Sequence, residues 1–403
     1  MQAGDGLYRL SPCLYPAFTA QQSQQKGEQP PQVLHIRRKE AFDSRAGVII
    51  MYMFKYVCKR IGLMLITFTI IIVTCFVLVK LLPVSTTSVG FGEDANKIIA
   101  QMVSRGYMKY DEVSGGYINT PILEQLIRYL RRIVLEGDFG VGFNIPEYRG
   151  RAVWNVFIEK LPPTILINIY SSLFAVPLGI ALGIFAALKK NKWQDHLIST
   201  LVMVFISVPA FVYASLLLYI VCFKLSALPL GVMSLPDVMA AYPEKGYQYI
   251  PGEFNWSLYF NKKMFLSMLP AVFSMSFGSI AGYARSTRAE LTEVLTSEFM
   301  LLARTKGLTK SQATVRHALR NAMVPIFPSI IGEFISVLSG SLIIEKIFQI
   351  PGVGGLYLAA INSRDYDFFM MLSGFYLLVG LLAGLVIDLS YGFIDPRIRM
   401  GAK

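Results

Sequence analysis

The sequence predicts an all-α membrane protein with six transmembrane helices. Hydrophobic residues make up 54% of its 403 residues and charged residues only 16%, a composition too apolar for a soluble domain of this length. Several apolar runs reach the roughly 20 residues that a helix needs to cross a bilayer. Lysine and arginine gather at the ends of these runs that the positive-inside bias assigns to the cytoplasm.

The first 52 residues are predicted to form a disordered extension. They are rich in glutamine, proline and charge, and they carry no apolar core that would let them fold. Met51 and Met53 directly precede the first membrane-type sequence, which leaves a start at one of them as an alternative. A basic amphipathic arm is a second alternative.

The first transmembrane helix is predicted over residues 53–82. Lys55, Lys59 and Arg60 precede its apolar run and place the N-terminus in the cytoplasm. Residues 83–160 are mixed and polar, with a Gly-Gly turn signal and a helical pattern. We expect them to form an external domain after helix 1.

Residues 161–403 are predicted to form a five-helix core. The lysines within 189–192 mark the return of the second span to the cytoplasm, and Pro209 interrupts the third. The alternation places residues 224–263 and 345–367 outside and both termini in the cytoplasm. The five apolar runs are 161–188, 197–223, 264–284, 322–344 and 368–394.

The polar segment between the fourth and fifth runs, residues 285–323, carries seven basic and three acidic residues, which predicts a cytoplasmic location. Gly307 separates two helical patterns, as a helix terminator would. Thr309 and Gln312 have the spacing of a capping box. We expect two short helices around a glycine, facing an aqueous partner. The patterns are Leu291, Val294, Leu295, Phe299 and Leu302, then Val315, Ala318, Leu319, Ala322 and Met323.

Glu333 stands near the middle of the fifth apolar run. An ionised side chain there costs at least about 3 kcal/mol on insertion scales, so it should face a cavity or a partner, or be protonated. Ser336 and Gly340 fall on about the same helical face. This face is predicted to be either a wall of a solute path or a packing seam of small residues with one hydrogen-bonded Glu.

Four glycines in the apolar runs are spaced for close helix packing. Gly179 with Gly183, and Gly380 with Gly384, form pairs four residues apart that let two helix backbones approach each other. A close helix–helix contact is therefore predicted at each pair.

The sequence lacks the usual residues for chemistry on a substrate. It contains no G-x-x-x-x-G-K-[ST], and its three histidines are too scattered for a zinc site. We therefore expect no catalytic residue, metal or cofactor on this chain. The net charge of +12 is explained by basic loops at an anionic cytoplasmic leaflet, and nucleic acid is not an expected partner.

The residues of the polar segment also indicate a family. LLARTKGLTKSQATVRHALRNAMVP closely resembles the cytoplasmic EAA-type loop of ABC importer permeases, in the version of the dipeptide and oligopeptide group. GDFGVGF, SVPAF, EKIFQIPGVGGL, RDYD and IDLSYGFIDPRIR resemble further motifs of that group, in the same order. The resemblance runs from about residue 53 to residue 399.

The resemblance implies a type I ABC importer-like permease in a bacterial cytoplasmic (inner) membrane. Its cytoplasmic loop would insert into a groove of a separate ATPase, which binds ATP and Mg. The implied partners are a second homologous permease subunit, two ABC ATPase subunits, an extracytoplasmic solute-binding protein, a peptide substrate and the lipid bilayer. Leu301 and Leu302 stand where the general pattern has Glu and Ala. The residues that we expect to couple to the ATPase are Glu298, Ala303, Arg304, Lys306, Gly307 and Leu308.

The sequence leaves alternatives for both the cargo and the class of protein. Permeases of this group carry peptides, nickel chelates, glutathione or oligosaccharides, and the resemblance does not choose among them. A self-sufficient channel or carrier would need more membrane charge than Glu333 and Asp388 offer, and usually internal repeats, which the sequence lacks. A sensor or scaffold whose external domain binds peptide is the third hypothesis.

Overall fold

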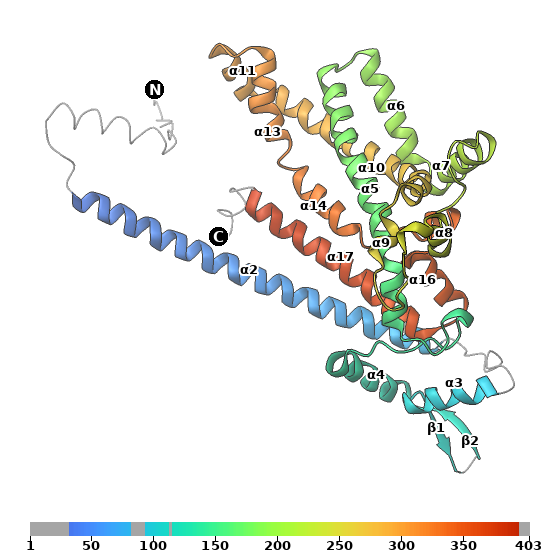
Figure 1. Cartoon of the computed structure of the whole chain (residues 1–403). Coiled ribbons are helices and arrows are strands. Elements are labelled where there is room, and N and C mark those ends of the chain that lie inside the picture. Colours follow the sequence, from blue (N-terminus) through green and yellow to red (C-terminus); the bar gives the residue numbers. More distant parts are fainter. Residues whose placement is uncertain (1–31, 82–92, 113–114, 395–403) are drawn as a thin grey trace. The chain divides into compact units, whose positions relative to one another are not determined.

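The computed structural model describes residues 32–81, 93–112 and 115–394. These residues form helices and one antiparallel hairpin (Figure 1). The elements up to the second long membrane helix are α2 (Gln32–Leu81), α3 (Glu93–Ser104), β1 (Met108–Asp111), β2 (Gly116–Asn119), α4 (Ile122–Arg131), the π-helical turn η2 (Arg132–Glu136), the 3₁₀ turn η3 (Pro146–Tyr148) and α5 (Val153–Leu188). The later elements are α6 (Trp193–Ser207), α7 (Ala210–Leu217), η4 (Leu218–Lys224), α8 (Leu235–Ala241), η5 (Pro243–Lys245), α9 (Trp256–Tyr259), α10 (Lys262–Leu295), α11 (Glu298–Thr305), α12 (Lys310–Ala313), η6 (Thr314–Ala318), α13 (Leu319–Ala322), α14 (Phe327–Ser336), α15 (Leu342–Ile347), α16 (Val353–Asn362) and α17 (Tyr366–Ile394).

The N-terminal extension differs from the prediction where the structure describes it. The chain divides after Arg60 into two compact units, and α2 begins at Gln32 in the first of them. Residues 32–52, for which the sequence predicts disorder, belong to helix α2 in the structure, and this stretch contains no proline. The prediction for residues 1–31 lies outside the described residues.

Four helices of the described chain are long and apolar enough to cross a bilayer. They are Phe54–Leu81, Val153–Leu188, Lys262–Leu295 and Tyr366–Ser390. The predicted third span is a pair of helices, Trp193–Ser207 and Ala210–Lys224, bent by 102°. Pro209 has no N–H to continue the first helix, and Val208 before it is extended, as the residue preceding a proline prefers.

The predicted fifth span is not one continuous helix. Its apolar run is divided among the end of α13, the ten-residue α14 and the start of α15. Pro325 and Pro328 lie at the first break, and Gly340, at φ +63°, lies at the second. Six continuous spans are therefore not seen in the described residues, which hold four such helices and the bent pair.

Helices α5 and α10 pack against each other along much of their length (Figure 1). A Cβ on Gly179 would lie 2.8 Å from the Ile280 carbonyl oxygen, and one on Gly183 would lie 2.7 Å from that of Ala284. Only glycine permits this approach, so the predicted contact at the first pair is confirmed. The contact predicted for Gly380 and Gly384 is wrong within the described chain, because a Cβ on either glycine would meet nothing within 4 Å.

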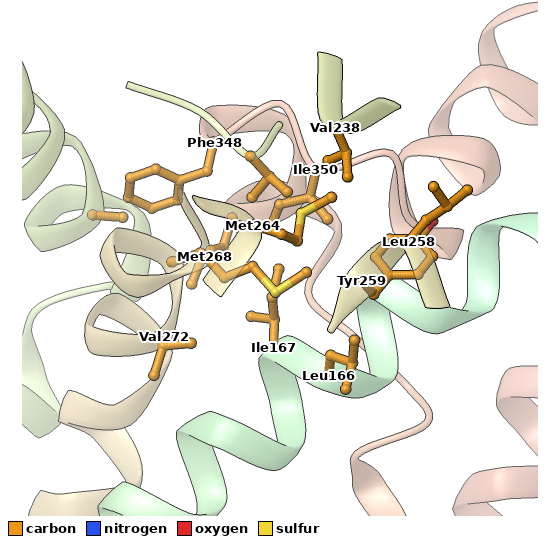
Figure 2. Close-up of a cluster of buried hydrophobic side chains, with 14 residues drawn as sticks. Leu166, Ile167, Val238, Leu258, Tyr259, Met264, Met268, Val272, Phe348 and Ile350 are labelled. Carbon is orange, nitrogen blue, oxygen red and sulfur yellow. The ribbon is translucent and has the colours of Figure 1, made fainter. Parts of the chain in front are cut away.

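A cluster of buried side chains joins the same two helices to the loops beyond them (Figure 2). Ile167 of α5 faces Met264 and Met268 of α10, and Phe348 and Ile350 cover them after α15. Val238, Leu258 and Tyr259 bring α8 and α9 onto the cluster. The 224–263 segment is thus folded onto the helical core.

Two buried carboxylates fasten the segment after α2 to the start of α17. Asp365 Oδ2 accepts the backbone N–H groups of Phe143 and Asn144, each at 2.7 Å, and that of Ile145 at 3.3 Å. Asp367 accepts the Tyr107 hydroxyl at 2.5 Å. Burial raises the pKa of Asp365 and raises that of Tyr107 well above its usual value. The two carboxylates of RDYD therefore hold the GVGF turn by its backbone donors, Asp365 through Phe143 and Asp367 through Val141 at 3.2 Å.

A third buried carboxylate closes the turn between α15 and α16 against α5. Glu345 Oε2 accepts the N–H of Gly354 at 2.7 Å, and its Oε1 accepts the Thr164 hydroxyl at 3.1 Å. The Thr164 oxygen in turn accepts the N–H of Val353 at 2.9 Å. Burial raises the pKa of Glu345 to about 7. A Cβ on Gly340 would collide with this carboxylate, which accounts for glycine at the second break.

The glycine contact between α5 and α10 is open to a direct stability test. We expect Gly183→Ala to lower the free energy of unfolding by about 1–3 kcal/mol, because the added methyl overpacks a backbone contact. Gly380→Ala, in a helix with free space around it, should leave stability unchanged or raise it slightly. Unfolding of the solubilised protein by sodium dodecyl sulfate measures both. Equal stabilities of the two variants would contradict the contact.

Candidate coupling segment and membrane cavity

The segment 285–323, here called the coupling segment, begins as the last turns of α10. A single helix predicted over its first apolar pattern is wrong, because the chain breaks between α10 and α11. The hydroxyls of Thr296 and Ser297 bond back to the carbonyls of Glu293 and Val294, at 2.9 and 2.6 Å. Such hydroxyls compete with the helical hydrogen bonds and favour a break.

The second helical part of the coupling segment starts as predicted. Gln312 donates its backbone N–H to Thr309 Oγ1 at 3.3 Å, and its side chain accepts the Thr309 N–H at 3.1 Å. This reciprocal pair is a complete capping box. Gly307, between α11 and α12, adopts φ +89° with open space where a Cβ would be. The helix-glycine-helix geometry is therefore present.

One face of the coupling segment packs onto the membrane helices. Met300 of α11 is buried against Leu291 of α10 and Ala187 of α5. Ala303 and Leu308 are partly buried on the same cluster. The second helical part contributes Ala313, Ala318 and Ala322 to it. Small side chains let this part lie close to α5 and α10, so the segment is joined to both helices.

The other face of the coupling segment is exposed. Glu298, Arg304, Lys306 and Gly307 lie on it, so the structure divides the six predicted coupling residues between an inner and an outer face. Large apolar side chains are exposed there as well, which is typical of surfaces that bind another protein. We call these residues the outer apolar set: Phe299 (43% exposed), Leu301 (66%), Leu302 (56%) and Val315 (62%).

An ion pair between the buried Asp195 and the partly exposed Arg288 anchors the root of the coupling segment, and sequence reasoning missed it. Asp195, at the start of α6, is completely buried and accepts Arg288 Nε at 2.5 Å and Nη2 at 2.8 Å. It also accepts the N–H of Asn191, in the turn after α5, at 2.9 Å. The pair ties the α5–α6 turn to α10. The sequence signal that could have revealed this pair is that Asp195 is the one carboxylate beside the lysines of residues 189–192.

A cavity of about 450 Å³ lies between α10 and the α13–α14 region. Glu333 lines it and accepts the Ser279 hydroxyl at 2.7 Å. Tyr283 donates its hydroxyl to the Ser329 carbonyl at 3.1 Å across the same interface. The lining residues are Ser279, Gly282, Tyr283, Ser286, Glu290, Pro325, Ile326, Ser329 and Glu333. This is a polar cavity with two carboxylates beside helices that are otherwise apolar.

The three predicted path residues do not gather at this cavity. Glu333 lines it, whereas the Ser336 hydroxyl bonds to the Gly332 carbonyl at 2.9 Å on its own helix. Gly340 lies against Glu345 instead. A Cβ on Gly332 would lie 2.6 Å from Ile387 Cδ1 of α17. Helix α14 thus packs against α17 at Gly332 and lines the cavity at Glu333.

Comparisons with known proteins place the chain among transport proteins. Residues 179–400 match the family model "Binding-protein-dependent transport system inner membrane component". The chain is 30% identical to the dipeptide transport system permease protein of Bacillus subtilis (strain 168), over 87% of this chain and 100% of that protein. It is 29% identical to the oligopeptide transport system permease protein of Haemophilus influenzae, over 86% and 100%. It is also 30% identical to the glutathione transport system permease protein of Escherichia coli (strain K12), over 86% and 99%. A crystal structure of an amino acid ABC transporter with histidines overlaps 59% of this chain and 94% of that one, with a TM-score of 0.38 and 18% identity.

The Asp195–Arg288 pair gives the site a stability prediction. Asp195→Asn keeps the size of the side chain but removes the charge that holds the guanidinium, and we expect it to lower the free energy of unfolding by about 2 kcal/mol. The control is Glu124→Gln, which removes a surface pair with Arg128. It should change stability by less than about 0.5 kcal/mol. Detergent-titration unfolding compares them, and an equally small effect of both would show that the buried pair does not anchor the segment.

Proposed function

The chain belongs to the family of binding-protein-dependent transport system inner membrane components, and on this premise we propose that it moves di- or oligopeptides into the cell as the permease subunit of an ATP-driven ABC importer. The permease names of its relatives support transport, and two of them name peptides. The glutathione relative supports a second candidate cargo, which is itself a small peptide.

The observation that carries the proposal is the two-faced coupling segment. Its inner face packs on α5 and α10, while its outer apolar set is exposed without a covering element from the described chain. A separate ATPase subunit would cover that face and bind ATP and Mg, for which this sequence has no phosphate-binding loop. Closure of the ATPase would push on the segment, and the shared cluster would pass the movement to the membrane helices.

The polar cavity supports a place for this subunit in the solute path. It lies along α10, the helix that continues into the coupling segment, so movement of α10 changes the wall that Glu333 and Ser279 form. A second homologous permease would supply the opposite wall. Solute would arrive from an extracytoplasmic binding protein seated on the 83–160 domain and the two outer loops, and both termini would lie in the cytoplasm of the bacterial cell.

Two experiments separate this proposal from its rivals. A self-sufficient carrier or channel would transport solute without ATPase subunits, so their co-purification with this chain and the ATP dependence of uptake distinguish the two. A peptide sensor would bind peptide without flux in reconstituted vesicles. ATP-dependent accumulation of a labelled dipeptide is the expected result.

Gly307 is the residue whose substitution tests the coupling role most directly. We expect Gly307→Val to reduce dipeptide uptake roughly 5- to 30-fold, because a side chain at positive φ costs about 1–2 kcal/mol and displaces the second helix. Gly307→Asn should retain most uptake, because Asn tolerates the left-handed region.

Gly246 supplies the matched control for that test. It also has positive φ and open space around it, but it lies in the 224–263 segment, away from the coupling segment. Gly246→Val should leave uptake within about twofold of wild type if only strain at the coupling glycine matters. Membrane insertion of each variant is checked by its yield in the membrane fraction. Normal uptake by an inserted Gly307→Val protein would refute the coupling role.

A further inference from the structure

A second cavity, of about 280 Å³, lies where the end of α2 meets the domain that follows it and the start of α17. We call it the Lys80 cavity. Its volume is just below the usual range for small-molecule sites, so it fits a ligand the size of an amino acid or one end of a peptide. Its lining is formed by Lys80, Met102, Tyr107, Met108, Asn119, Thr120, Ile122, Gln125, Phe143, Asn144, Tyr366 and Asp367.

Aromatic rings hold the Lys80 ammonium at this cavity. Its Nζ lies 4.1 Å from the ring centroid of Tyr107, 4.6 Å from that of Tyr366 and 5.6 Å from that of Phe76. Ring faces attract a cation but leave its N–H donors without acceptors. Within the described residues, Lys80 has no ion pair within 4.0 Å. The Lys80 ammonium is thus positioned at the cavity wall, where its N–H groups can donate hydrogen bonds to a bound molecule.

Two further polar atoms on the wall, Gln125 Oε1 and the Tyr366 hydroxyl oxygen, have no hydrogen-bond partner among the described residues. Gln125 is 5% exposed, and its Nε2 donates to the Thr120 carbonyl at 2.8 Å, which leaves its Oε1 unpaired. The Tyr366 hydroxyl is unpaired as well. A buried polar atom without a partner is unfavourable, so a bound molecule that pairs both atoms would be favoured.

These groups specify the chemistry of the ligand. The Lys80 ammonium and the Tyr366 hydroxyl are donors that suit a carboxylate, whereas Gln125 Oε1 needs a hydrogen-bond donor, which an N–H group of a peptide supplies. The Asp367 carboxylate also lines the cavity, so it repels a dianion and favours a ligand that carries positive or N–H character beside its negative group. A phosphodiester on a lipid meets the donors but offers no hydrogen to this acceptor side, and free phosphate, much of which is a dianion near neutral pH, is repelled by Asp367.

We propose that the Lys80 cavity binds the carboxyl-terminal end of a short peptide, with its carboxylate on Lys80 and an N–H group on Gln125. This inference rests on the proposed function only for the choice of a peptide over a free amino acid. It gives the domain after α2 a direct contact with solute, separate from the cavity beside Glu333 in the core.

The test is equilibrium binding to the purified full-length chain in nanodiscs, without ATP. The probes are dialanine, dialanine amide and inorganic phosphate, measured by titration calorimetry. We expect dialanine to bind at least tenfold more tightly than its amide, which lacks the carboxylate, and phosphate to compete poorly. Lys80→Met should weaken dialanine binding at least tenfold. Lys109→Met removes another lysine of the same domain, outside the cavity, and should not change it.

A measurement on the wild-type chain guards against a Lys80 variant that fails to fold. Dialanine should protect Lys80 from acetylation by a water-soluble ester, as read by mass spectrometry, whereas dialanine amide should not. Equal binding of acid and amide, wild-type affinity in Lys80→Met, stronger binding of phosphate, or no binding at all would each overturn the inference. A chain that transports dialanine but shows no binding dependent on Lys80 overturns this inference alone. Binding without any uptake refutes only the proposed function.

Discussion

The backbone contact between α5 and α10 at Gly179 and Gly183 is the constraint on which the rest of the structure depends. Because no side chain separates the two helices there, they act as one body, and serine hydroxyls reinforce the join where Ser171 and Ser276 lie 3.1 Å apart. The coupling segment packs on both helices at one end of this body. The 224–263 segment and the chain after α15 pack on it at the other end, through the cluster in Figure 2. The cavity beside Glu333 lies along α10, so the same body connects the segment to a wall of that cavity.

Buried carboxylates hold the loops in place, as the glycine contacts hold α5 and α10 together. Asp365 and Glu345 each accept backbone N–H groups from a glycine-containing turn. These donors compensate for the water that each carboxyl group loses on burial. The motifs GVGF, RDYD and PGVGG, which lie far apart in the chain, therefore act as two clamps. The first of them, between GVGF and RDYD, places the Lys80 cavity beside the start of α17.

The sequence predicted those features that depend on local rules. Composition and apolar runs identified a helical membrane protein, the capping box at Thr309 was confirmed, and the Gly179 pair marked a real helix contact. The break at Thr296, the interrupted fifth run and the Asp195–Arg288 pair were missed. The break at Thr296 depends on hydroxyls that override an apolar pattern, and the ion pair depends on a partner distant in sequence, neither of which periodicity alone registers. The interrupted fifth run follows Pro325, Pro328 and Gly340, which a count of apolar residues ignores. Glu333 was expected to face a cavity or a partner, or to be protonated, and it lines a cavity, whereas Ser279 and Glu290 of α10, which line the same cavity, were not predicted.

We propose that the coupling segment, α5 and α10 move as a rigid unit when the proposed ATPase subunits close. Spin labels at Lys190, after α5, and at Thr305, on α11, report the distance within this unit once the four native cysteines are replaced. A second pair, at Ala289 on α10 and Phe334 on α14, spans the cavity region and reports that movement has occurred. Pulsed electron paramagnetic resonance on the assembled importer, with and without ATP, should give an unchanged distance for the first pair and a changed one for the second. A first pair whose distance shifts with ATP while the second stays fixed would contradict the account.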